Sequence, residues 1–359
     1  MISQSLNKQG IYAVRGIAAF LVLFLHITSN LVPQSTWVDK SGVLSDIFPW
    51  VFRGEVGVGV FIFLSGFLLT LNIPQTGLQW GQFYLRRFSR IYPVYLVVLI
   101  ISISSSRYWD FNGFINAIIL LPNLPGTLWP APWLSTAWSL GVEWTLYLAF
   151  PLMILSIKTR ARNLLLLVSF LVSMILFGHA FGTDFHTLVY GSILGRAIEF
   201  VLGMFMALHF QKLKNLNPIN LPPLILATFA IFQAWCTWYL HAGGSASDSY
   251  LRIFQPFAES LFAFTLIVIF QGKLIAQTRH LFTPIVFMSV VSYPLYLTHL
   301  IVLDGIKRFS TAKPTSWIGQ SVGLQSVFII ALSLILAWII HEAIEKPGMR
   351  LGRSKRVNF

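Results

Sequence analysis

Residues 12–28, YAVRGIAAFLVLFLHIT, lie in an apolar segment (11–31) that is long enough to cross a membrane as a helix. Eleven residues separate Arg15 from His26, which is almost three full turns. Both side chains therefore project from one helix face, about 16 Å apart along the axis. Ionisable side chains are costly in hydrocarbon and normally face a protein interior or a wet cavity, so this face predicts a functional site.

The composition places the chain among membrane proteins. It has 359 residues, of which 56% are hydrophobic and 10% charged, and a mean hydropathy of +0.72, outside the range of soluble globular domains. The first apolar segment lacks a small-residue cleavage site, so no cleavable signal is expected. The single cysteine, Cys236, excludes an internal disulfide.

Polar and Pro/Gly-rich breaks divide the chain into ten candidate helices, which predict an all-α, polytopic transmembrane bundle. We expect one integral membrane domain over residues 1–359, with no appended soluble domain. The predicted segments are 11–31, 50–72, 91–106, 138–157, 163–181, 188–210, 222–240, 253–272, 282–303 and 322–345.

The Lys/Arg distribution predicts the orientation. Cations gather on alternate connections and in the C-terminal tail, so the positive-inside rule places both termini in the cytoplasm. The loop over 304–321 is discordant, because it carries three cations on the opposite side. The net charge of +13 follows mainly from this topology and from contact with lipid headgroups, and we expect no nucleic-acid partner.

The rise per residue along each predicted helix gives the depth of its polar groups in the membrane and predicts which of them meet. His26 lies about 22 Å along the first helix, in the outer half of the membrane, and Glu143 lies about 7 Å below the outer end of the fourth. A buried imidazole oriented by a carboxylate is suited to general-base catalysis on a hydroxyl. The structural alternative is that both residues only hold helices together. Small residues beside Arg15, namely Gly16, Ala18 and Ala19, permit close helix approach and favour the functional interpretation.

Arginines dominate the segment before the third helix. If 82–90 is helical, Arg86 and Arg90 share a face with Arg87 alongside, and such a cluster binds phosphates through forked hydrogen bonds. The alternative is anchoring to lipid headgroups. The cluster predicts a binding site for a phosphate-bearing donor on the cytoplasmic side.

Other polar groups are predicted to line the same site. Arg196 and Glu199, three residues apart, either neutralise one another or line it. Tyr296 and His299 belong to a helical stripe that either lines a cavity or bonds neighbouring helices. Neither an HExxH motif nor paired Cys/His spacing appears, so no metal site is predicted.

Seven ordered motifs resemble acyltransferase family 3, a family of integral membrane proteins that O-acylate, mostly O-acetylate, cell-surface and exported sugars. They are YAVRGIAAFLVLFLH, GVGVFIFLSGFLLT, FYLRRFSRIYPVY, AWSLGVEWTLYLAFP, GRAIEFVLGM, SYPLYLTH and HEAIEKP. The resemblance implies a bacterial inner-membrane protein of about ten helices that passes an acyl group from cytoplasmic acyl-CoA to a glycan hydroxyl.

The resemblance also implies roles for individual residues. The RG…H motif falls on Arg15, Gly16 and His26, the RxxR motif on Arg87 and Arg90, and the SLxxE motif on Ser139, Leu140 and Glu143. His26 is implied as base or transient acyl acceptor with Glu143 as its partner, and the arginines as ligands of the coenzyme A phosphates. Gly59 stands where relatives often have an aspartate. Some members continue into a periplasmic hydrolase-like domain, so this chain either completes transfer itself or hands the acyl group to a separate periplasmic transferase.

The sequence therefore predicts O-acyl transfer, acetyl in the first instance, with acetyl-CoA as donor and a glycan or lipid-linked sugar as acceptor. Two alternatives from other classes stay open. A secondary transporter would use the buried Arg, Glu and His as a proton relay. A non-catalytic membrane subunit would only bind lipid-linked glycan for another enzyme.

Overall fold

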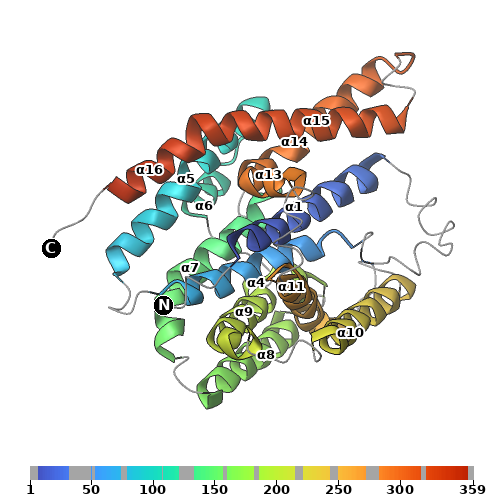
Figure 1. Ribbon diagram of the computed structural model, residues 1–359. Helices are drawn as coiled ribbons and strands as arrows, with labels where there is room; N and C mark the ends of the chain where they lie inside the picture. Colours follow the sequence, from blue (N-terminus) through green and yellow to red (C-terminus); the bar gives the residue numbers. More distant parts are fainter. Residues whose placement is uncertain are drawn as a thin grey trace.

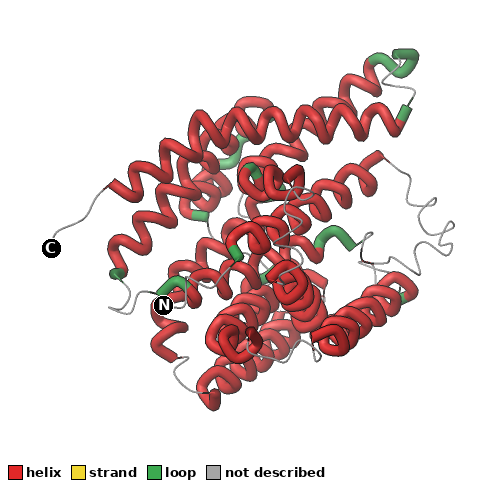
Figure 2. The backbone as a smooth tube through the Cα atoms, viewed as in Figure 1, coloured by secondary structure: helices red, strands yellow, loops and turns green. Residues whose placement is uncertain are grey.

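The computed structural model describes residues 7–31, 50, 53–73, 79–106, 108–120, 133–156, 160–181, 186–214, 221–242, 250–271, 283–316 and 321–354. Within these ranges the chain is helical and contains no strand (Figure 2). The predicted all-α class is confirmed. Both termini are predicted to be cytoplasmic, and the terminal residues lie outside the described ranges.

The helices follow the apolar segments of the sequence. They are α1 (Lys8–Leu31), α4 (Val56–Leu71), α5 (Trp80–Ser105), α6 (Phe111–Ile119), α7 (Ala137–Ser156), α8 (Arg160–Phe181), α9 (Ile193–Lys214), α10 (Leu221–His241), α11 (Gln255–Gln271), α13 (Thr283–Val290), α14 (Ser292–Ala312), α15 (Val322–Ile340) and α16 (Lys346–Ser354). A π-helical turn (Thr187–Gly191) precedes α9, a 3₁₀ turn (Tyr250–Phe254) precedes α11, and a second π-helical turn (His341–Glu345) joins α15 to α16.

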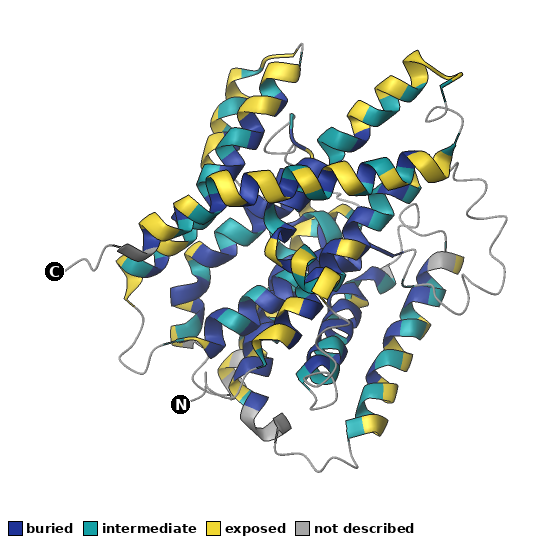
Figure 3. Cartoon of the chain, turned by 45° about the horizontal axis from the view of Figure 1, so that its top comes forward, coloured by how far each residue is buried: buried dark blue, intermediate teal, exposed yellow. Residues whose placement is uncertain are grey.

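Among the described residues, seven helices are long and apolar enough to cross a membrane, or eight if the bent pair α13–α14 counts as one span. Two shorter apolar helices, Val56–Leu71 and Leu164–Ala180, accompany them. Each of the ten predicted segments therefore contains a helix, and the chain is a polytopic membrane protein. Many large apolar residues are exposed along these helices, as a lipid-facing surface requires. Figure 3 shows exposed residues along several of the helices.

Helix α1 runs through the middle of the bundle and contacts α4, α11, α13 and α14 (Figure 1). The helices α8, α9, α10 and α11 lie on one side of it, and α5, α15 and α16 on the other. The polar side chains in the middle of α1, those of Arg15 and His26, are therefore at least half-buried between neighbouring helices. This position makes the first helix the element around which a site can form.

Glycines let the central helices touch. A Cβ atom on Gly16 would lie 1.9 Å from the carbonyl oxygen of Ile285 in α13, and one on Gly57 would lie 2.4 Å from that of Ala18 in α1. Such distances are impossible for a larger residue without a shift of backbone. The predicted close approach at the small residues of the first helix is confirmed.

Two boundaries differ from the sequence prediction. Helix α5 begins at Trp80 rather than at residue 91, so the arginine-rich segment is its first part. The ninth predicted segment is broken at Val291, where α13 and α14 meet at 83°. Pro294 explains the break, because its ring would clash with the carbonyl of residue 290 in a continuous helix.

Candidate active site

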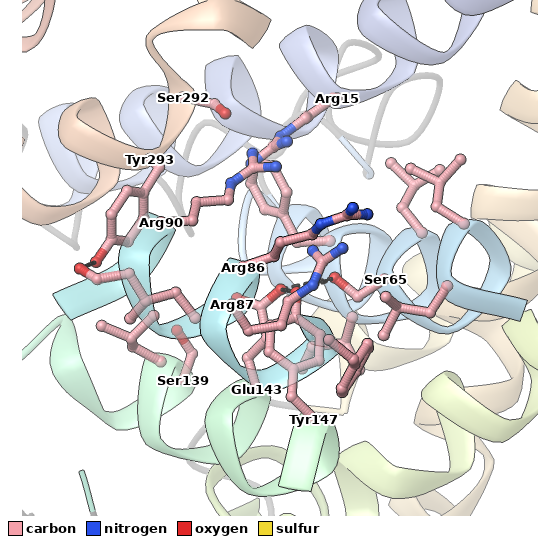
Figure 4. Close-up of a pocket in the computed structure, with 18 of the residues that line it drawn as sticks. Arg15, Ser65, Arg86, Arg87, Arg90, Ser139, Glu143, Tyr147, Ser292 and Tyr293 are labelled. Atoms are coloured by element: carbon pink, nitrogen blue, oxygen red, sulfur yellow. Dashed lines mark hydrogen bonds between the residues drawn. The ribbon is translucent and has the colours of Figure 1, made fainter. Parts of the chain in front are cut away.

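A cavity of about 640 Å³ lies between α1, α4, α5, α7 and α14 (Figure 4). Its wall is apolar along α4 and rich in basic and hydroxyl groups elsewhere. The polar lining residues are Arg15, Ser65, Asn72, Gln79, Gln82, Arg86, Arg87, Arg90, Ser139, Glu143, Tyr147, Ser292, Tyr293 and Tyr296. The structure thus brings together arginines from two separate sequence motifs, together with the serine and the glutamate of a third.

In the part of the chain that the structure describes, four guanidinium groups and one carboxylate, that of Glu143, line this cavity. Arg15 comes from α1, and the other three come from the first part of α5. Figure 4 shows the arginines gathered on one side of Glu143. Arg15 lies within electrostatic reach of Arg90, which opposes its charge, and of Glu143, which favours it. The cavity wall therefore carries a surplus of positive charge.

The arginines are poorly satisfied within the protein. The Nε atoms of Arg15 and Arg87 are buried and have no hydrogen-bond partner among the described residues. Aromatic rings supply part of their contacts: Arg15 lies 5.8 Å from the ring centre of Phe61, and Arg87 lies 5.4 Å from that of Tyr147. A buried charge with free donors is costly unless an anion completes it. The arrangement is suited to a ligand with several negative charges.

Glu143 is held by neighbours in the cavity. Ser65 of α4 donates a hydrogen bond of 2.6 Å to its Oε1, and Tyr147, one turn further along α7, donates to the same oxygen. The hydroxyls of Ser65 and Tyr147 lie 3.0 Å apart, so the three side chains form one cluster. Ser65 and Tyr147 were not predicted as site residues. The i, i+4 spacing of Glu143 and Tyr147 was the available signal for the second.

The expected contact between Glu143 and His26 is not made. Within the described chain, Nδ1 of His26 instead lies 2.9 Å from the carbonyl oxygen of Val22 and 3.1 Å from Nε2 of His299. The predicted depth of Glu143 was wrong, because Glu143 lines the same cavity as Arg15, which lies about 16 Å from His26 along α1. Counting residues from an assumed membrane boundary does not fix the level at which a helix begins within the bundle. Glu143 belongs with the arginines, and His26 belongs with His299.

The two histidines adjoin the cavity without lining it. The rings of Tyr296 and His299 lie 6.0 Å apart, and the Tyr296 hydroxyl lies 2.6 Å from that of Ser139. Tyr296 and Ser139 both line the cavity, as predicted for the site. Tyr296 thus connects the arginine-lined space to the His26–His299 pair.

Arg196 and Glu199 form a separate cluster outside this lining. Nη1 of Arg196 lies 2.5 Å from Oε1 of Glu199 and 2.7 Å from Oε2 of Glu259, and all three side chains are fully buried. Gln255 donates to the other oxygen of Glu259 at 2.7 Å. The two residues therefore neutralise each other, which was one of the two predicted interpretations. Glu259 was missed, because it is a single acid within a long apolar helix.

Gly59 lies directly against this cluster. A Cβ atom there would lie 2.1 Å from Oε2 of Glu259 and 3.0 Å from Oε1 of Glu199. Carboxylates from α9 and α11 thus occupy the space beside the position where relatives often carry an aspartate. Among the described residues, no group of three or more His, Cys, Asp or Glu side chains is arranged to hold a metal ion.

Comparison with known proteins agrees with these features. Acyltransferase MdmB of Streptomyces mycarofaciens is 25% identical over 377 residues, which cover 96% of this chain and 92% of that protein. Peptidoglycan O-acetyltransferase OatA of Listeria monocytogenes serovar 1/2a is 25% identical over 355 residues, which cover 85% of this chain and 53% of that protein. The chain thus spans about half the length of the listerial relative. No solved structure matches it.

The family model described as an acyltransferase domain matches residues 8–342, which is nearly the whole chain. The resemblance that the ordered motifs predicted is therefore confirmed, and the transporter alternative gains no support. The protein belongs to this acyltransferase family and is an integral membrane acyltransferase.

Proposed function

We propose that the protein transfers an acyl group, acetyl in the first instance, from cytoplasmic acyl-CoA to a hydroxyl of a cell-surface or exported glycan at the bacterial inner membrane. One observation supports acyl-CoA as the donor. Among the described residues, four arginines, two of them with buried unpaired Nε atoms, and a single carboxylate line one cavity. Coenzyme A carries several phosphate charges, and arginine forks match phosphate oxygens.

The spacing along α1 supports the same donor. Arg15 and His26 are about 16 Å apart on the helix axis. A donor with a long flexible arm between its phosphates and its thioester is able to bind at Arg15 while its reactive carbon moves toward His26. Coenzyme A has such an arm. The apolar wall formed by residues such as Leu64, Leu68 and Phe61 suits its uncharged part.

His26 would supply the base. The acceptor hydroxyl gives its proton to an unprotonated ring nitrogen of His26 while its oxygen bonds to the thioester carbon. The carbon–sulfur bond then breaks, and the coenzyme A thiolate recovers the proton to leave as the thiol. The balance is one ester formed and one thioester consumed, without a metal or redox partner.

The acceptor assignment draws on the relatives. OatA is named as a peptidoglycan O-acetyltransferase, and the family resemblance implies a glycan hydroxyl. We extend this class of acceptor, a glycan or a lipid-linked sugar, to the present chain. A separate periplasmic transferase is the partner expected if the acyl group leaves this protein on a carrier.

Acetyl transfer in the native membrane tests this function. Mass analysis of surface glycans, with and without the protein, should show O-acetyl groups that disappear in its absence. His26→Ala should abolish them at an unchanged protein level, since general-base catalysis contributes about 10²–10⁴-fold. His209→Ala is the matched control, because His209 bonds to its own helix carbonyl but lies outside the cavity lining. Normal acylation by His26→Ala would refute the role of His26.

A further inference from the structure

The side chains of His26 and His299 are in direct contact through one nitrogen of each ring. His26 lies on α1 and His299 on α14, 273 residues apart in sequence, and their ring centres are 4.9 Å apart. Nε2 of His299 lies 3.1 Å from Nδ1 of His26. His299 is almost completely buried, whereas His26 is partly exposed. The buried ring of His299 therefore lies behind the partly exposed ring of His26.

Backbone carbonyls fix the proton on each ring. Nδ1 of His299 lies 2.9 Å from the carbonyl oxygen of Leu295, and a carbonyl oxygen only accepts hydrogen bonds. Nδ1 of His299 therefore carries the proton, and in the neutral ring Nε2 presents a lone pair. Nδ1 of His26 meets the carbonyl oxygen of Val22 at 2.9 Å in the same way, so it carries a proton too.

The two rings are complementary in this state. The Nδ1–H group of His26 is shared between the Val22 carbonyl and the lone pair of His299, and no two hydrogens oppose each other. A proton on Nε2 of His299 would point at the Nδ1–H group of His26 and break this contact. The arrangement leaves Nε2 of His26 as the ring atom without a proton.

We propose that His299 is the positioning residue of His26, holding the ring so that its Nε2 atom faces the reacting groups and receives the proton of the acceptor hydroxyl. This inference rests on the proposed function. When Nε2 takes that proton, the charge spreads to Nδ1–H, and the hydrogen bond to His299 becomes charge-assisted. A neutral imidazole thus performs the task for which sequence reasoning selected the carboxylate of Glu143.

Nε2 of His26 is also the reacting atom if His26 itself is acylated during transfer. In that case Nε2 attacks the thioester carbon, a carbon–nitrogen bond forms as the carbon–sulfur bond breaks, and the thiolate takes a proton from water. The acceptor oxygen then bonds to the acyl carbon as the carbon–nitrogen bond breaks, its proton neutralises the hydroxide left from that water, and Nε2 is restored. In both routes Nδ1 keeps its proton and its bond to His299.

Kinetics of the full-length protein in lipid vesicles test this role. His299→Leu removes the acceptor and keeps an apolar side chain, while His299→Gln restores an oxygen that accepts from Nδ1–H of His26. Hydrogen bonds to charged groups contribute about 1.5–3 kcal/mol, so His299→Leu should lower kcat about 10- to 100-fold. The KM for acetyl-CoA should stay unchanged, because His299 does not line the arginine cavity. His299→Gln should recover most of the lost kcat.

A purely structural role predicts a different pattern. If His299 only packs α14 against α1, then His299→Gln should be as impaired as His299→Leu, and thermal stability should fall in proportion. Wild-type kcat in His299→Leu, or equal loss in both variants, would overturn the proposal. His209→Leu serves as the control for a histidine outside the site.

A second measurement does not depend on turnover. Nitrogen-15 NMR of histidine-labelled protein in bilayers reports which ring nitrogen is protonated, with His26→Gln and His299→Gln used for assignment. Protons on Nδ1 of both rings are expected. A proton on Nε2 of His26 would overturn the inference even if acetyl transfer is normal, whereas absence of acetyl transfer with Nδ1–H on both rings would overturn the proposed function alone.

Discussion

Single residues set the charge of the cavity. Arg15 and Arg87 are largely removed from water, yet each keeps an Nε donor without a protein partner in the described chain. Leaving a buried guanidinium group partly unpaired is costly, so it indicates a ligand that completes the hydrogen bonds. Inside the cavity, the carboxylate of Glu143 partly offsets the positive charge of these arginines. The ligand-free protein thus holds charges that repel one another until an anion binds.

Glu143→Gln tests this balance of charge. Glutamine keeps an oxygen for the bonds from Ser65 and Tyr147 but removes the only lining carboxylate among the described residues. We expect a lower thermal midpoint for the ligand-free protein and a larger rise on adding coenzyme A than in the wild type. Thermal unfolding in detergent with and without coenzyme A measures both. An unchanged midpoint together with an unchanged ligand-induced rise would show that Glu143 does not offset the arginines.

Individual site residues were only partly predictable from sequence. Helical spacing put Arg15 and His26 on one face of the first helix, where a charge inside an apolar helix is expected to face a cavity. The structure places Arg15 in one cavity with the arginines of 86–90, a proximity that the sequence did not predict. Helical spacing also did not identify the partner of His26. Neither the level at which one helix begins relative to another nor its rotation about its own axis is readable from sequence, because both depend on packing. The close contacts at glycines such as Gly16 set that rotation here.

At the scale of elements, glycine contacts fix how the helices meet. A Cβ atom on Gly66 of α4 would lie 2.1 Å from the carbonyl oxygen of Phe200, and one on Gly203 of α9 would lie 2.1 Å from that of Phe63. The two helices therefore touch backbone to backbone at two reciprocal points. This contact positions Ser65, the residue before Gly66, against Glu143.

Gly66→Ala should therefore destabilise the bundle. The added methyl group forces α4 away from α9, and overpacking of this kind costs about 1–3 kcal/mol. Gly305→Ala in α14 is the matched control, since a Cβ atom there has no neighbour within 4 Å. Thermal unfolding of both variants compares them directly. Equal midpoints would show that the α4–α9 contact has room for a side chain.

The extent of each element was less predictable than its existence. Helix α5 starts eleven residues before the predicted boundary, because a search for apolar runs stops at arginines that in fact face a cavity. The bend between α13 and α14 was missed for the opposite reason. Its residues are apolar enough to be taken as one continuous span, and Pro294 is the residue at the bend that marks the interruption.

At the scale of the whole molecule, the bundle places the arginine-lined cavity next to the His26–His299 pair. Helices α1 and α5 supply the arginines, whereas α1 and α14 supply the histidines, so α1 takes part in both. Composition alone predicted a polytopic helical protein, and the ordered motifs predicted its family. The family model confirms this over residues 8–342.

The central claim is that the arginine cavity binds the phosphates of an acyl-CoA donor. Equilibrium binding of radiolabelled acetyl-CoA to the purified full-length protein tests it most directly, with Arg87→Ala and Arg90→Ala as variants and exposed Arg350→Ala as the control. We expect saturable binding that coenzyme A displaces and acetyl-pantetheine does not. Loss of a charged hydrogen bond should weaken it about tenfold or more in the two cavity variants only. Absence of binding, or equal binding by all four proteins, would contradict the account.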